Sequence, residues 1–406
     1  MSRILIIGAG WEQVELIKRI KDEGHFIIAT HPFMSVDGLN LADSFYIKDS
    51  RDIKGHITIA ETHKIDAVIT DNCDYSFFTA AVVASKFKLP FADIQSAIYS
   101  NDKYAQRLAC RKQNLQQPVF FEARTLNDVK AAIDQIGFPA IIKPVDSRGT
   151  FGVTILNDQC NVENAFFDAM DNSPSRRLIC EQFILGTLVT VDGFCFKNGH
   201  RALTVASRKF EMGPKPVTKE IIYPAEFPAE IREQLLKNHE SVVKGLGYTY
   251  GHSHGEYILT DTNDIFLVEC TNRGGGVYTS SVILPLLTEI DINLSLLNQS
   301  MGIDTLEIEA GQVNFMKKSV ILTFLDFEVG SVIKSINLAE MLNEPYTVRF
   351  RSIYSQNDMV ESIENCASRH SMLVLKGASV ESAKKNLVKF KESLNIEYYS
   401  SYDKLD

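Results

Sequence analysis

The sequence has little of what marks a secreted or membrane-spanning protein. Its seven cysteines are odd in number, scattered and free of any C-x-x-C pair. This pattern argues against a disulfide framework or a zinc site and favours a reducing cytosol. The chain lacks the roughly 18 consecutive apolar residues of a transmembrane helix, and its start lacks the zones of a signal peptide. We therefore expect a cytoplasmic protein that does not bind membranes.

Positive charge is also scarce. The 42 Lys and Arg residues are outnumbered by 51 Asp and Glu residues, which gives a formal net charge of −9 without any basic cluster. Binding to nucleic acid or to an anionic membrane surface therefore has little electrostatic support. We expect small molecules as partners, and any anion among them must be met by a local site.

The chain is too long for one ordinary core. It has 406 residues, of which 45% are hydrophobic and 23% charged, whereas single cores stop growing near about 250–300 residues. Strand-like runs at 3–7, 26–30 and 65–70 alternate with helical spacing at 12–23 and 77–87. Strands that alternate with helices predict a parallel sheet with crossovers. Neither an internal repeat nor a low-complexity linker interrupts the chain, so the lobes are expected to pack closely.

Two glycine clusters are candidates for phosphate binding. Gly8-Ala9-Gly10 stands between a predicted strand and helix, but Gln13 replaces the third glycine of a dinucleotide fingerprint. We favour a tight turn there over NAD binding. Lys143 begins a second cluster that includes Ser147, Gly149, Thr150 and Gly152. A lysine in an apolar strand calls for an anion, and such a loop can wrap phosphate. The alternative is a surface lysine beside an ordinary hairpin.

Glu256 and Glu269 flank the turn-rich segment 260–264, and a hairpin centred there places them opposite each other. Period-two alternation predicts that Ile258, Ile265 and Leu267 share their face. Opposed carboxylates on an apolar face repel unless a proton or cation lies between them, and Mg²⁺ is a cation of suitable chemistry. Exposed, solvated acids on a surface hairpin are the alternative.

The order of these features resembles the ATP-grasp superfamily, in particular its carboxylate–amine ligase branch, which includes L-amino-acid ligases and relatives of biotin carboxylase and carbamoyl-phosphate synthetase. The matching segments are 4–10, Asp102-Lys103, 138–144 with its glycine loop, 181–186, and 255–256 with 269–273. The segment 329–333 is similar to the family's C-terminal subdomain. Each match alone is weak, but five in order cover roughly residues 3–300.

The resemblance implies an α/β and α+β fold, with a Rossmann-like N-terminal domain at 1–95 followed by an ATP-grasp domain at 96–305. A small lid subdomain at about 115–185 and a C-terminal α+β subdomain at 306–406 complete it. The implied reaction is ATP-dependent ligation of a carboxylate to an amine through an acyl phosphate, releasing ADP and phosphate. The cofactors implied are ATP and Mg²⁺. A homodimer is compatible with the resemblance.

The resemblance also implies residue roles. Lys103 and Lys143 contact ATP phosphates, and the loop containing Ser147, Gly149, Thr150 and Gly152 closes over them. Glu181 faces the adenine amino group, while the Gln182 carbonyl and the Ile184 N–H pair with the ring edge. Glu256 and Glu269 hold Mg²⁺. Arg273, with Lys143 as a second catalytic residue, neutralises charge on the transferred phosphoryl group or the acyl phosphate.

Two positions depart from the family pattern. Leu188 stands where an acid usually binds the ribose hydroxyls, and Thr271 stands where an asparagine usually ligates the metal. These departures leave open an ATP-binding regulatory protein without turnover. A carboxylase or phosphorylating enzyme of the same superfamily is a further alternative, and a dinucleotide-dependent oxidoreductase is a distant one. The retained glutamates, lysines and Arg273 favour an active ligase.

Overall fold

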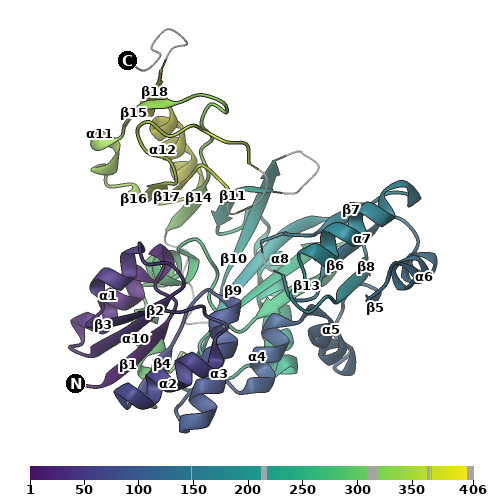
Figure 1. Cartoon of the computed structure of the whole chain (residues 1–406). Helices are drawn as coiled ribbons and strands as arrows, with labels where there is room; N and C mark the ends of the chain where they lie inside the picture. The colour runs from purple at the N-terminus through teal and green to yellow at the C-terminus, as the bar shows by residue number, and fades with distance from the viewer. Residues whose placement is uncertain (148, 212–216, 309–317, 364–365, 367, 400–406) are drawn as a thin grey trace.

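The computed structural model describes residues 1–147, 149–211, 217–308, 318–363, 366 and 368–399. Figure 1 shows a purple N-terminal domain, a small lid built on its own sheet, and a large central sheet that continues into the C-terminal region. No helix in these ranges combines the length and apolar character that a membrane span requires. The predicted combination of α/β and α+β architecture is confirmed.

The N-terminal domain is a parallel sheet in the order β3-β2-β1-β4. Successive residues of β1 belong to two different hydrophobic clusters, because helices cover both faces of the sheet. This explains why the β1 run is continuously apolar. The sequence predicted β1 with the observed bounds but missed β3 and α2. The elements are β1 (Arg3–Ile7), η1 (Trp11–Gln13), α1 (Val14–Asp22), β2 (Phe26–His31), η2 (Asp37–Leu41), β3 (Ser44–Ile47), α2 (Ile53–His63), β4 (Ala67–Ile69) and α3 (Asp74–Phe87).

The lid is a four-stranded antiparallel sheet in the order β5-β8-β6-β7, with two helices packed against it. Its first helix starts at a capping box, in which the Thr125 hydroxyl and the Asp128 carboxylate each accept a backbone N–H of the other residue. The lid elements are β5 (Phe120–Ala123), α6 (Leu126–Ile136), β6 (Ala140–Pro144), β7 (Thr154–Leu156), η3 (Gln159–Asn161), α7 (Val162–Asp171) and β8 (Leu178–Gln182).

The large sheet is antiparallel, in the order β13-β12-β9-β10-β11-β14-β17-β16. Strand β14 pairs with β11, so the C-terminal region extends the sheet that carries the central strands. The strands are β9 (Thr187–Phe196), β10 (Gly199–Glu211), β11 (Val217–Tyr223), β12 (His252–Leu259), β13 (Ile265–Thr271), β14 (Ser319–Thr323), β16 (Thr347–Ser352) and β17 (Ser371–Gly377). The domain boundaries expected from the sequence stay a prediction.

The remaining helices surround this sheet. Helix α10 packs against α1 and β4 and so joins the central region to the N-terminal domain. Strands β15 and β18 form a separate two-stranded sheet. The elements are α4 (Ile94–Asn101), α5 (Lys103–Lys112), α8 (Ala229–Leu246), η4 (Thr279–Ile283), α9 (Leu284–Thr288), α10 (Ile292–Ser300), β15 (Ile333–Asn337), α11 (Ala339–Leu342), α12 (Val380–Ser393) and β18 (Asn395–Tyr398).

Candidate active site

A cavity of about 600 Å³ lies between the lid and the large sheet. Strands β6 and β8 contribute one wall, and β9, β12 and β13 contribute the opposite wall. All but two of the predicted site residues line it: Lys103, Lys143, Ser147, Gly149, Thr150, Glu181, Gln182, Ile184, Glu256 and Glu269. Residues up to 166 positions apart in the sequence are thus brought to one place.

The lid side of the cavity contains a buried cluster of three charges. Glu181 on β8 accepts from Lys143 Nζ at 2.6 Å and from Arg107 Nε at 2.7 Å. Burial alone would raise the pKa of Glu181, but the two cations outweigh it and lower that pKa to about 2. Burial lowers the pKa of Lys143, and Glu181 opposes that effect. Glu181 therefore holds Lys143 in place inside the cavity.

Sequence reasoning missed Arg107. This side chain is 1% exposed and also donates through Nη2 to the carbonyl of Val268 on β13, at 2.8 Å. Arg107 on α5 therefore joins Glu181 on the lid strand β8 to Val268 on β13 of the opposite wall. The four-residue spacing between Lys103 and Arg107 places both side chains on one face of α5. This spacing was the sequence feature that could have identified Arg107.

The pairing of Glu256 with Glu269 is confirmed. The register then shifts by one residue, because Val268 is an extra residue on β13 and forms a bulge. The predicted face is consequently wrong for Ile265 and Leu267, which are buried in the core with Tyr257 and Leu259. Phe266 and Val268 line the cavity in their place. The bulge thus turns Glu269 and Val268 toward the cavity.

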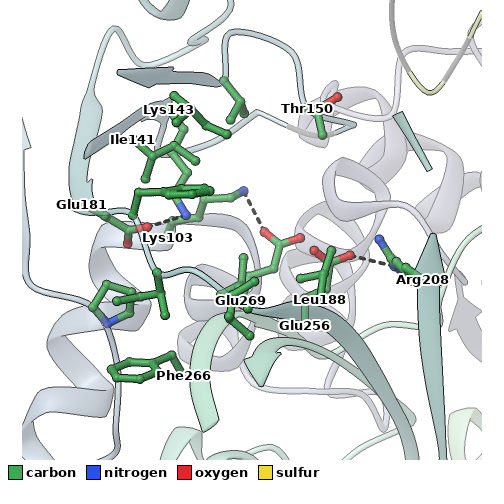
Figure 2. A pocket seen from close by; sticks show the side chains of 18 of the residues that line it. Lys103, Ile141, Lys143, Thr150, Glu181, Leu188, Arg208, Glu256, Phe266 and Glu269 are labelled. Carbon is green, nitrogen blue, oxygen red and sulfur yellow. Dashed lines mark ion pairs between the residues drawn. The ribbon is translucent and has the colours of Figure 1, made fainter. Parts of the chain in front are cut away.

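Each carboxylate of this pair has its own cation (Figure 2). Lys103 Nζ lies 2.9 Å from Glu269 Oε2, and Arg208 Nη2 lies 2.8 Å from Glu256 Oε1. Burial opposes the charged state of Lys103, but Glu269 raises its pKa. Burial likewise opposes ionisation of Glu256, yet Arg208 keeps its pKa well below the usual range. The repulsion predicted between the acids is therefore compensated by protein cations.

The end of β9 and β12 next to the acids is buried and polar. His254 Nδ1 lies 2.6 Å from Asp192 Oδ1, and His254 Nε2 lies 3.8 Å from Glu256. Burial opposes protonation of His254, but Asp192 outweighs it and raises the pKa to about 9. Thr271 donates through its hydroxyl to the His254 carbonyl at 3.3 Å. His254 is thus hydrogen-bonded to Asp192 and lies within ion-pair distance of Glu256.

The loop after β6 lies against the same cavity. Gly149 and Thr150 both have positive φ, at 62° and 67°. Lys103 Nζ donates to the Ser147 carbonyl at 3.0 Å, which ties this loop to α5. Arg148 lies outside the described residues. Gly152 is not among the residues lining the cavity but packs against α7, where a Cβ atom would lie 3.0 Å from the Ala169 Cα.

Arg273 is the second predicted residue outside the cavity lining. It follows β13 and forms a two-bonded ion pair with Asp74 of the N-terminal domain, at 2.7 and 3.1 Å. Its guanidinium also donates to the Gly274 carbonyl at 2.9 Å. Burial opposes its charge, but Asp74 raises its pKa. The structure therefore places Arg273 at the contact between the central region and the N-terminal domain.

The family model described as "ATP-grasp domain" matches residues 136–281, a range that includes Lys143, Glu256 and Glu269. This match confirms the resemblance inferred from the sequence over that part of the chain.

Two curated relatives and one solved structure illustrate what the chain is similar to. A formate-dependent phosphoribosylglycinamide formyltransferase from Bacteroides thetaiotaomicron is 25% identical over 287 residues, which are 67% of this chain and 71% of that protein. An alanine–anticapsin ligase from Bacillus subtilis is 22% identical over 63% of this chain and 58% of that protein. An L-amino acid ligase structure from Bacillus licheniformis has a TM-score of 0.83 at 17% identity, covering 98% and 99% of the two chains. The structural likeness shows a shared fold.

Proposed function

We propose that this protein is an ATP-dependent ligase that joins a carboxylate to an amine through an acyl phosphate and releases ADP and phosphate. The observation that carries the proposal is a cavity in which Lys143 and Lys103 face the paired acids Glu256 and Glu269. The names of relatives that are ligases of amino acids support the same class of reaction. ATP and Mg²⁺ are the proposed cofactors.

The cavity suggests how ATP lies. The Gln182 carbonyl and the Ile184 N–H are proposed to bind the edge of the adenine, next to Glu181. Although both Glu181 oxygens already accept from cations, a carboxylate has about four lone-pair sites and still has room for the adenine amino group. Lys143 and Lys103 then meet the phosphates, with Ser147, Gly149 and Thr150 above them. The proposed nucleotide thus extends from Gln182 and Ile184 toward the acid pair.

The proposed reaction has two bond exchanges. A carboxylate oxygen of the acid attacks the γ-phosphorus of ATP, the bond from that phosphorus to ADP breaks, and an acyl phosphate forms. The amine nitrogen then attacks the acyl carbon and loses a proton, while the carbon–oxygen bond to phosphate breaks. Lys143 and Lys103 hold the charged oxygens in position. Arg273 can meet the acyl phosphate only if its guanidinium leaves Asp74.

Glu256 and Glu269 fit a Mg²⁺ ion by their chemistry. They are directly paired, line the cavity and offer hard oxygen ligands, whereas no group of three His, Cys, Asp or Glu in the described ranges could hold a metal. Such a site relies on phosphate oxygens for its remaining ligands. When bound, Mg²⁺ would neutralise charge on those phosphates. Arg208 and Lys103 would then share the carboxylates with the ion.

Release of ADP tests the proposal. The protein is incubated with Mg·ATP and a panel of carboxylic and amino acids, with and without amines. We expect ADP release that depends on an acid–amine pair and is lost in Lys143→Ala. Dependence on bicarbonate alone would instead indicate a carboxylase. Binding of ATP without ADP release across the whole panel would favour the regulatory alternative.

We also propose that the ligase works in the cytoplasm. All seven cysteines are free thiols in the structure, and several are buried, which suits a reducing compartment. Rapid alkylation of the exposed Cys160 in freshly extracted protein would support this, whereas a disulfide at that position would contradict it. A homodimer stays a prediction, and sedimentation analysis of the full chain tests it.

A further inference from the structure

The cavity floor on the large sheet is built from cross-strand rows of different chemistry. Leu188 on β9 pairs with Ile258 on β12, which pairs with Phe266 on β13. All three residues line the cavity, so this row is entirely apolar. The next row is Thr190, Glu256 and Glu269 in the same strand order. On β9 and β12 the residues between the two rows, Val189 and Tyr257, are buried in the core, as the pleat requires.

The apolar row lies along the path of a nucleotide. Resting on the proposed function, the base binds at Gln182 and Ile184, and the phosphates lie at Lys103 and Glu269. In ATP the ribose connects these two parts, so the ribose must cross the floor between them. Figure 2 shows Leu188 close to Glu256, at the phosphate end of this stretch. For a nucleotide bound in this way, the ribose would lie over the apolar row that contains Leu188.

Every carboxylate in the described lining of the cavity already has a cation partner. These carboxylates belong to Glu181, Glu256 and Glu269. Glu181 is held by Arg107 and Lys143 at the base end, while the other two are paired with cations and assigned to Mg²⁺. Thr187 also lines the cavity, but it neighbours Leu188 along the strand, and alternation turns the two side chains to opposite faces.

We infer that this protein does not read the ribose hydroxyls of its nucleotide and accepts 2′-deoxy-ATP in place of ATP. Leu188 is the residue that sets this tolerance, because it offers van der Waals contact where a carboxylate would offer a charge-assisted hydrogen bond. A lost hydrogen bond to a charged group costs about tenfold or more in affinity. A protein that makes no such bond loses nothing when the hydroxyl is removed.

Calorimetric titration of the full chain with Mg·ATP and with Mg·2′-deoxy-ATP tests this inference. We expect the two dissociation constants to differ by less than about tenfold. A difference of tenfold or more in favour of ATP would overturn it. If ATP itself does not bind, the proposed function fails, which is a result distinct from ATP binding without binding of the deoxynucleotide.

The variant Leu188→Glu makes the test specific to this position. Leu188 is only partly buried, so a glutamate can be accommodated, and thermal unfolding verifies that the variant folds. We expect it to prefer ATP over 2′-deoxy-ATP by about tenfold more than the wild type does. Val329→Glu adds the same charge at a residue that is 57% exposed and outside the cavity, and should leave the ratio unchanged. An unchanged ratio in Leu188→Glu would overturn the role of Leu188.

Discussion

At the scale of single residues, the site is organised by ion pairs that bring cations and acids from different elements together. Glu181 joins α5 to the lid strands, and Glu269 joins α5 to the large sheet. Removing one member of a buried pair leaves the other charge uncompensated, which costs more than the pair itself contributes. The two predictions below use this cost at Glu181.

Glu181→Gln is expected to destabilise the protein by about 3–5 kcal/mol at pH 7, because Arg107 and Lys143 keep their buried charges without a partner. Urea unfolding measures this change. Glu381→Gln is a matched control, because its pair with Lys385 lies on the surface of α12 and contributes little. Equal stability of Glu181→Gln and the control would contradict the buried cluster.

The same residue predicts a pH dependence of stability. The pKa of Glu181 is about 2 in the folded protein, below its ordinary value of 4.5. Its ionised form therefore stabilises the fold fully above pH 4.5, and this contribution is lost as the pH falls toward 2. Denaturant unfolding between pH 5 and pH 3 should show a steeper loss of stability in the wild type than in Glu181→Gln. Parallel pH profiles would count against the lowered pKa.

Glu269→Gln is predicted to remove the coupling between Mg²⁺ and ATP binding. Without this carboxylate the proposed Mg²⁺ site would keep one acid instead of two, so Mg²⁺ should no longer strengthen ATP binding in calorimetry, and turnover should fall by orders of magnitude. Repulsion between the two acids alone would predict that Glu269→Gln gains stability. We expect no such gain, because Lys103 lies 2.9 Å from Glu269 and compensates its charge. Glu233→Gln on α8, whose carboxylate is exposed, should bind as the wild type does. Normal Mg²⁺ dependence in Glu269→Gln would exclude the metal role.

At the scale of elements, the hairpin β12–β13 shows how far sequence reasoning extends. The turn-rich residues between the strands were enough to place Glu256 opposite Glu269. The bulge at Val268 could not be predicted, because it depends on how β13 packs against α5 and on the Arg107 bond to the Val268 carbonyl. Period-two alternation assumes an unbroken strand, and one extra residue exchanges the two faces.

Gly152 in the lid loop combines a positive φ with close packing. Gly152 has a φ of 68°, and an added Cβ would lie 2.9 Å from the Asn172 Cβ and 3.0 Å from the Pro144 Cγ. Gly152→Ala therefore combines backbone strain with a clash, and it should weaken ATP binding and reduce hydrogen-exchange protection in β7 and α7. Gly24→Ala is the control, because its φ of 74° gives similar strain with nothing within 4 Å of the added Cβ. Equal effects of the two substitutions on lid protection would contradict the packing role.

At the scale of the whole molecule, the site depends on elements from distant parts of the chain. The order of lid, central sheet and N-terminal domain could be inferred from motifs, because each motif is local. The counter-charges could not, since Arg208 on β10 and Asp74 on α3 carry no local pattern that identifies Glu256 and Arg273 as their partners. Such pairs depend on tertiary contacts that the sequence alone does not reveal.

The central claim is that the carboxylates and cations of one cavity activate an acid by phosphorylation. Trapping with hydroxylamine tests it directly, because hydroxylamine reacts with an acyl phosphate as a substitute for the unidentified amine. The wild-type protein is incubated with Mg·ATP, hydroxylamine and a panel of carboxylic and amino acids, and hydroxamate and ADP are measured together. The account predicts equal amounts of hydroxamate and ADP with at least one acid, and neither product with Lys143→Ala. ADP release without hydroxamate for every acid that stimulates it would contradict an acyl phosphate and the ligase built on it.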